Sequence, residues 1–329
     1  MTWLQGLLPA QRLIIYFSAS AFAMAAAGLL WSGYRLDWAG HGTMILALLV
    51  LATATWFYSA IRPDRRLATT LLATAAVLVF VNSSSILNYT LLALDRPLID
   101  DVLVGWDAAI GFVWPDFVAA MVQWPVLVFI LHIGYLSALP QIAILLILLG
   151  FCGRTDALHR FVLLLMITAF LTIGMWAAFP SFGAMAYYGL SPELAAELNL
   201  AVGPDYGEDL RALAGHQGPV WISPSELKGL IAFPSFHTVL ALLSVYGAMA
   251  IRALIVPFAV LNVTALAAVP LHGGHHLVDI FAGMVVFVVG LILARRLLAT
   301  STRAIGQAVQ TNPIGARSLP AQASGSKGR

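Results

Sequence analysis

The sequence predicts an all-α fold, a polytopic membrane bundle of about eight transmembrane helices. Hydrophobic residues make up 60% of the 329 residues, charged residues make up only 10%, and the mean hydropathy is +0.90. Soluble domains carry about 25% charged residues, so this composition excludes an ordinary soluble domain. Apolar stretches of about twenty residues, the length that crosses a bilayer as a helix, recur along the chain.

Eight such stretches define the predicted spans. They are residues 12–31, 40–61, 68–93, 125–150, 158–179, 234–252, 254–271 and 276–297. The sixth and seventh are short and almost contiguous, so their boundaries are the least well defined. Within the fourth, Pro140 predicts a kink, because proline lacks a backbone N–H and its ring displaces the preceding turn.

Basic residues favour one side of the predicted bundle. If the N-terminus faces the cytoplasm, the inner segments hold thirteen of the 17 Lys and Arg residues, and the outer segments hold thirteen of the 15 acidic residues. Lys and Arg accumulate in the short cytoplasmic loops of membrane proteins. We therefore expect both chain ends to be cytoplasmic and both polar motifs described below to face outward.

Three parts of the chain differ in composition. Residues 1–94 form an N-terminal transmembrane block, residues 95–299 carry the polar motifs and form the expected catalytic domain, and residues 300–329 have the Ser/Gly/Gln/Ala composition of a disordered cytoplasmic tail. The acidic connector 94–124 predicts a short helix at the outer interface. The long hydrophilic segment 181–233 predicts a lid or cover over the site.

The first polar motif opens the sixth span and reads Pro234-Ser235-Phe236-His237. Proline suits the first turn of a helix, and serine there caps free backbone N–H groups. Those N–H groups and the positive end of the helix dipole attract anions. The motif therefore predicts a phosphate cradle with His237 at its rim. The alternative is structural: an ordinary N-cap followed by a histidine at the membrane interface.

The second polar motif, His275 to Asp279, opens the eighth span. Residues four apart lie on one face of a helix, and a carboxylate bonded to one imidazole nitrogen leaves the other free to attack. Gly273 and Gly274, just before it, allow a backbone or a ligand to approach closely. The alternative is a His–Asp pair that stabilises a helix start, but two such motifs on one side of the membrane favour chemistry. The single Cys152 excludes an intramolecular disulfide, no Cys/His spacing predicts a metal site, and we expect no cofactor.

In combination, the motifs resemble the type 2 phosphatidic acid phosphatase superfamily, whose fold is shared with vanadium-dependent haloperoxidases. Its members carry a Pro-Ser-x-His block and, downstream, a His-x-x-x-Asp block, which here are Pro234 to His237 and His275 to Asp279. The Gly-Gly-His opening, Asp95-Arg96-Pro97 and the stretch from Tyr135 to Gln141 are similar to the branch near inositol phosphorylceramide synthase and its bacterial relatives. The likeness covers about residues 95–297 and implies a core of that helical fold.

The resemblance implies a role for each residue. His275 would attack phosphorus and form a phosphohistidine, and Asp279 would orient and charge-stabilise it. His237 would protonate the leaving oxygen and then activate the incoming water or alcohol. Ser235, Gly274 and the neighbouring backbone N–H groups would bind the phosphoryl oxygens. This is nucleophilic and acid–base catalysis by two histidines, without a metal.

Two features of the superfamily are absent. No lysine precedes Arg96-Pro97, and Ala268-Val269 stands where the family places Ser-Arg ahead of the nucleophile. A phosphoryl transition state concentrates negative charge, which cations normally stabilise. The predicted outer face holds only four cations, and among them we expect Arg96, Lys228 or Arg211 to bind the phosphate. For Lys228 and Arg211 the alternative is a solvated loop charge.

The remaining polar residues have structural interpretations. His276 would point away from Asp279 on a helix, which favours a packing role, and His132 is expected to hydrogen-bond within the bundle. Tyr135 and Gln141 could line a headgroup pocket, but polar residues between membrane helices usually bond to one another.

The sequence therefore favours an integral membrane lipid phosphatase or phosphotransferase that acts on a lipid phosphate, polyprenyl phosphate or phospholipid headgroup at the extracytoplasmic face. An inositol phosphorylceramide synthase-like transferase is the alternative within this class, because the two reactions differ only in the acceptor. From another class, a non-catalytic transporter or scaffold of the same fold would explain the missing cations. Transporters place polar groups near the bilayer midplane, whereas these motifs lie at helix ends.

The expected partners are the lipid substrate and the bilayer, with no nucleic acid, and the oligomeric state stays open. The family branch and the short loops favour a bacterial inner membrane, with the active site on the periplasmic side.

Overall fold

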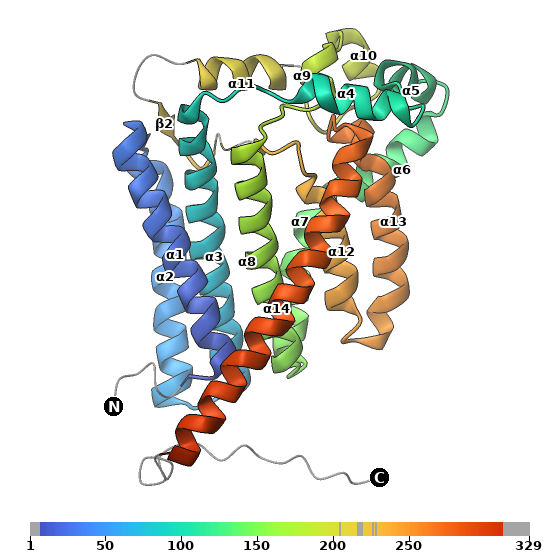
Figure 1. The fold of residues 1–329 in the computed structure, drawn as a ribbon. Helices are drawn as coiled ribbons and strands as arrows, with labels where there is room; N and C mark the ends of the chain where they lie inside the picture. Colours follow the sequence, from blue (N-terminus) through green and yellow to red (C-terminus); the bar gives the residue numbers. More distant parts are fainter. Residues whose placement is uncertain (1–6, 204, 216–219, 226, 228, 312–329) are drawn as a thin grey trace.

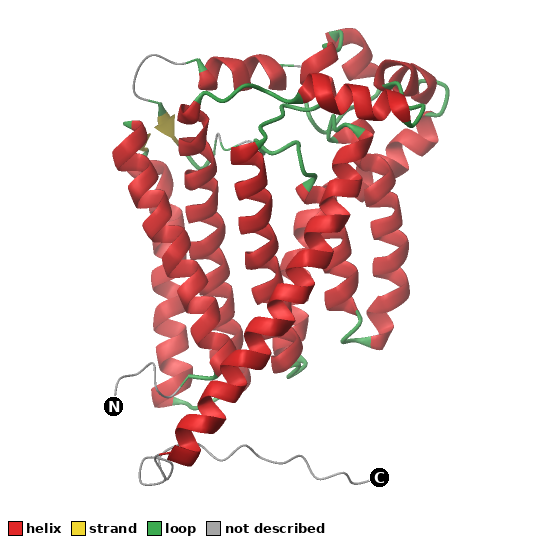
Figure 2. Ribbon diagram, viewed as in Figure 1, coloured by secondary structure: helices red, strands yellow, loops and turns green. Residues whose placement is uncertain are grey.

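The computed structural model describes residues 7–203, 205–215, 220–225, 227 and 229–311. These residues form an all-α bundle with one two-stranded pairing (Figure 2). The long helices run side by side along the bundle, and short helices lie across one of its ends (Figure 1). The predicted fold class is confirmed.

In the described part of the chain, six helices are long and apolar enough to cross a membrane. They are α1 (Pro9–Ser32), α2 (Trp38–Trp56, extended by a π-helical turn to Ile61), α3 (Arg65–Leu91, extended by a 3-10 turn to Leu94), α8 (Thr155–Ala178), α13 (Ile255–His272) and α14 (Leu277–Thr311). Helices α6 (Pro125–Leu136) and α7 (Ala138–Phe151) are long and apolar enough for a span when taken together, with a bend of 44° between them, and α12 (Phe236–Ala248) is a shorter apolar helix. Each of the eight predicted spans therefore corresponds to a helix or a bent pair.

The bend between α6 and α7 confirms the predicted kink. It falls at Ser137, three residues before Pro140. The proline ring clashes with the carbonyl four residues earlier, which is that of Leu136, the last residue of α6.

Polar side chains fix where several helices begin. Asp37 accepts a hydrogen bond from the Gly40 N–H at the start of α2, and Asp64 accepts from the N–H groups of Arg66 and Leu67 at the start of α3. Ser235 caps α12 through the N–H of Thr238. These caps satisfy N–H groups that have no partner within their own helix.

The two ends of the bundle differ. Helix α1 begins and α14 ends at one end, and α4 (Asp100–Ala109), α5 (Trp114–Met121), α9 (Ala184–Tyr188), α10 (Pro192–Glu197) and α11 (Tyr206–Ala214) lie across the other (Figure 1). The connector 94–124 is thus two short helices, bent by 72°, where the sequence predicted one. The described part of segment 181–233 contains α9, α10 and α11 and the strand β2 (Trp221–Ile222), which pairs in parallel with β1 (Arg35–Leu36).

Close packing joins the N-terminal helices to the rest. Helix α3 packs against α1 and α2 on one side and against α7 and α8 on the other, while α12 packs against α7, α8, α13 and α14. Between membrane helices small residues permit such approach: a Cβ on Gly283 of α14 would lie 2.6 Å from the carbonyl oxygen of Ser235. That contact brings the beginnings of α12 and α14 together.

The C-terminal region differs from expectation. Helix α14 continues to Thr311, whereas the composition predicted a disordered tail from residue 300. Residues 312–329 of that predicted tail lie outside the described residues.

Candidate active site

The two polar motifs meet at the end of the bundle covered by the short helices. His275 lies on the loop 273–276 between α13 and α14, Asp279 lies in the first turn of α14, and His237 lies in the first turn of α12. The backbone N–H of Ser235 donates to the carbonyl oxygen of Asp279 at 3.0 Å. Segments about forty residues apart in the chain are therefore joined directly.

His275 is held by Asp279. Its Nδ1 lies 3.0 Å from Asp279 Oδ2, and both side chains are buried. The same carboxylate oxygen accepts the backbone N–H of His276 at 2.9 Å. A carboxylate accepts only, so Nδ1 carries the proton and Nε2 is the nitrogen with a free lone pair. This is the arrangement required of an imidazole nucleophile.

His237 faces His275 across a short gap. Their ring centroids are 6.3 Å apart with the rings inclined at 69°. The Tyr135 ring stacks on His237 with centroids 4.2 Å apart, and its hydroxyl oxygen lies 3.4 Å from His237 Nδ1. Tyr135 thus fixes the plane of the His237 ring. The sequence predicted only a role for Tyr135 in helix packing or in a headgroup pocket, and not this contact.

Ser235 has the structural role of an N-cap. Its hydroxyl oxygen accepts from the Thr238 N–H at 3.3 Å, and the side chain is fully buried. The Ser235 hydroxyl pairs with the N–H of Thr238, the third residue of α12. The N–H groups of the first two residues, Phe236 and His237, have no hydrogen bond to the described residues. A helix start of this kind attracts an anion.

The two glycines beside His275 are closely packed against other parts of the protein and do not border open space. Gly274 has φ +62°, and a Cβ there would lie 2.6 Å from the Cβ of Met185; the Met185 N–H also donates to the Gly274 carbonyl oxygen at 3.1 Å. A Cβ on Gly273 would lie 2.6 Å from Cδ2 of His275. Met185 therefore already fills the space on one side of Gly274, the residue that was predicted to bind phosphate.

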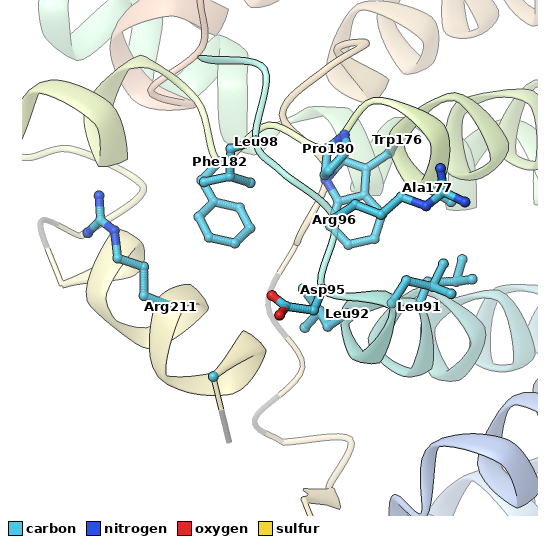
Figure 3. A pocket seen from close by; sticks show the side chains of 12 residues that line it. Leu91, Leu92, Asp95, Arg96, Leu98, Trp176, Ala177, Pro180, Phe182 and Arg211 are labelled. Carbon is cyan, nitrogen blue, oxygen red and sulfur yellow. The ribbon is translucent and has the colours of Figure 1, made fainter. Parts of the chain in front are cut away.

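The predicted cations do not gather at the histidines. Arg96 and Arg211 are exposed and line a hollow of about 270 Å³ together with Trp176 and Phe182 (Figure 3). In Figure 3 their guanidinium groups lie on opposite sides of this hollow, and Arg211 donates to the carbonyl oxygen of Ala186. Neither His237 nor His275 lines it. Lys228, the third predicted cation, lies outside the described residues.

A buried ionic cluster of His276, Asp100 and Asp107 lies directly beside the candidate nucleophile. His276 Nε2 is 3.3 Å from Asp100 Oδ1, and its Nδ1 is 3.5 Å from Asp107 Oδ2. Burial opposes the charged ring, but the nearby carboxylates of Asp100 and Asp107 and the charge of Asp279 outweigh burial and raise the pKa of His276 to about 9. His276 is therefore cationic at neutral pH, and its ring neutralises charge on α4.

Both acids of this cluster also hold backbone. Asp100 accepts from the Ser181 hydroxyl at 2.7 Å and from the Gly183 N–H at 2.9 Å, and Asp107 accepts from the N–H groups of Leu277 and Val278 at 3.0 Å each. The cluster therefore ties α4 and the 181–183 turn to the start of α14. Sequence reasoning assigned His276 to packing and missed the cluster. The available signal was the spacing of Asp100 and Asp107, seven residues apart and thus on one face of the predicted helix.

Comparison with known proteins identifies the family. The family model described as the PAP2 superfamily matches residues 101–293, which is more than half of the chain and includes both polar motifs. No curated protein and no solved structure matches the chain significantly.

Proposed function

The chain belongs to the PAP2 superfamily, and from this membership and the site geometry we propose an integral membrane phosphoesterase or phosphotransferase that acts on a phosphate-bearing lipid through a phosphohistidine. The observation that carries the proposal is the pairing of two imidazoles 6.3 Å apart, one of them bound to a buried carboxylate at 3.0 Å.

The proposed reaction has two balanced steps. In the first, Nε2 of His275 attacks phosphorus, the bond from phosphorus to the leaving oxygen breaks, and His237 gives that oxygen a proton. In the second, His237 takes the proton from water or an alcohol, the incoming oxygen attacks phosphorus, and the bond to His275 breaks. Asp279 stabilises the positive charge that develops on His275 in the first step.

The covering segment supports chemistry shielded from bulk water. The turn at Ser181 and the helix α9 contact the histidine loop through Asp100 and through the hydrogen bond from Met185 to Gly274. Restricting water strengthens electrostatic interactions inside a site and limits side reactions of the intermediate. Hydrolysis and transfer to an alcohol remain the two outcomes of the same intermediate, with an inositol phosphorylceramide synthase-like transfer as the second candidate.

The proposed activity is tested with the purified protein and a panel of lipid phosphates and phospholipids. We expect release or transfer of the phosphoryl group from at least one lipid, without added metal. Vanadate, which mimics five-coordinate phosphorus, should inhibit it. If no lipid in the panel reacts and vanadate does not bind, the protein is a non-catalytic member of the fold, as a transporter or scaffold would be.

We also propose that the histidines face the extracytoplasmic side, because the basic residues concentrate at the end where α1 begins. Cys152, exposed between α7 and α8, reports on that end. In intact cells an impermeant thiol reagent should leave Cys152 unlabelled, and permeabilisation should expose it. A Ser225→Cys variant in a Cys152→Ser background should show the opposite pattern. Labelling of Cys152 in intact cells would reverse the orientation.

A further inference from the structure

An apolar cavity of about 260 Å³ leads away from His237 between α3, α7, α8 and α12. Its inner part is lined by residues such as Val77, Phe80 and Leu165. Val81, 48% exposed, and Leu139, 69% exposed, also line it, so the cavity opens sideways through the surface between α3 and α7. That surface faces hydrocarbon in a membrane.

The cavity changes character along α3. Val77, Phe80, Ser84 and Asn88 follow one another at intervals of three or four residues, so they share the face of α3 that lines the cavity. The apolar pair comes first in the chain, and the polar pair lies nearer to the end of α3 at the covered side of the bundle (Figure 1). His237 lines the same cavity from the first turn of α12.

Ser84 and Asn88 lack protein partners for buried atoms. Ser84 is 6% exposed and Asn88 is 8% exposed, and among the described residues neither the Ser84 hydroxyl oxygen nor Asn88 Oδ1 has a hydrogen-bond partner. A buried polar group left unpaired is costly, and native proteins rarely keep one without a use. A ligand N–H or O–H group at this depth would donate to Asn88 Oδ1, and the Ser84 hydroxyl would donate to an oxygen of the ligand.

We propose that this cavity binds one hydrocarbon chain of the substrate, and that Ser84 and Asn88 bind the polar linkage between that chain and the phosphate. The inference rests on the proposed function, since it places the phosphate at His237 and His275. The substrate class is therefore a lipid whose phosphate is followed by an ester, an amide or a hydroxyl, and not a polyprenyl phosphate, whose chain carries no such group. The volume lies just below the range of about 300–1,000 Å³ for whole-ligand sites, which suits one chain rather than a complete lipid.

Helix α3, which carries Ser84 and Asn88, lies outside the segment that matches the family. The match begins at residue 101, whereas Ser84 and Asn88 belong to the N-terminal block. In this account the family segment supplies the phosphoryl chemistry, and α3 supplies the selection of the lipid.

The test compares four substrates in the same detergent: a diacylglycerol phosphate with an ester linkage, a sphingoid-base phosphate with hydroxyl and amine groups, a polyprenyl phosphate, and a small aryl phosphate without a chain. For the wild-type protein we expect kcat/KM on at least one of the first two to exceed that on the polyprenyl phosphate by about 10-fold or more. Whether the ester or the hydroxyl lipid is preferred identifies the linkage. Turnover of the aryl phosphate or any lipid establishes the chemistry independently.

Two variants and a matched control assign the preference to α3. Ser84→Ala and Asn88→Leu should each reduce the preference for the polar-linked lipid by about 3- to 10-fold, the value of one hydrogen bond. Because the readout is a ratio between two substrates for one protein sample, partial misfolding cancels. Ser83→Ala, on the same helix but outside the cavity lining, should leave the ratio unchanged. An active enzyme that prefers the polyprenyl phosphate, shows no preference, or keeps its preference in both variants overturns the inference alone; failure on all four substrates overturns the proposed function.

Discussion

Replacement of His275 by alanine is expected to reduce phosphoryl release or transfer by roughly 10⁴- to 10⁶-fold, because no intermediate can form without the attacking nitrogen. Replacement of His237 by alanine should cost roughly 10²- to 10⁴-fold, the usual contribution of a general acid–base. The two losses should not add, since His237 assists steps that cannot occur without His275. Initial rates on a lipid phosphate and on a small aryl phosphate measure both effects.

The split between the two substrates refines this prediction. An aryl phosphate has a better leaving group and needs less protonation, so the loss in His237→Ala should be smaller on the aryl substrate than on the lipid. His41→Gln serves as the control, because His41 lies at the start of α2 and its Nδ1 contacts the Asp37 carbonyl oxygen within the N-terminal block. Turnover above about a tenth of wild type in both His275→Ala and His237→Ala would contradict the assignment.

Replacement of His276 by glutamine is expected to lower the free energy of unfolding by about 3–5 kcal/mol, the cost of removing one partner from a buried ion pair. The change leaves Asp100 and Asp107 buried at 4% and 3% exposure without their cation. It also loosens the junction of α4 with the start of α14, because Asp107 binds the N–H groups there. Thermal or denaturant unfolding in detergent at neutral pH measures the loss.

The pH dependence of unfolding separates this ion-pair effect from a simple packing loss. The pKa of His276 is raised to about 9 in the folded protein, above the value of about 6.5 for an unperturbed histidine. A raised pKa contributes stability that is fully present below about pH 6.5 and is lost as the pH rises through about 9. Wild type should therefore lose stability over this window, and His276→Gln should not. Parallel curves for the two proteins would place the stabilisation elsewhere.

The spans could be predicted because hydropathy is a local property. In a bilayer, a segment of about twenty apolar residues forms a helix because the helix pairs its own backbone N–H and C=O groups. The bend at Ser137 follows from the local chemistry of Pro140. The predicted contact of polar residues between helices is confirmed for Gln141, whose Oε1 accepts from Asn262 Nδ2 at 2.6 Å. The contact of His275 with Asp279 was also predicted, although His275 lies on the loop just before α14 and does not share a helix with Asp279.

The rest depends on contacts between distant segments. His276 meets Asp100 across 176 residues of chain, and Tyr135 meets His237 across 102. No periodicity or spacing encodes such pairs in a single sequence. Arg96 and Arg211 were predicted to bind phosphate because outer cations are scarce, and the structure places them around a separate hollow. The distribution of Lys and Arg between loops predicts which side of the membrane a charge occupies, but tertiary packing decides which residues it contacts.

The most direct test of the central claim is to quench the reaction rapidly with a lipid phosphate that carries a radiolabelled phosphoryl group, and to map the label on the protein. We expect an acid-labile, base-stable phosphohistidine at His275 in the wild-type protein, and no such label in His275→Ala. Turnover with no protein-bound label, or label on another residue that persists in His275→Ala, would contradict it.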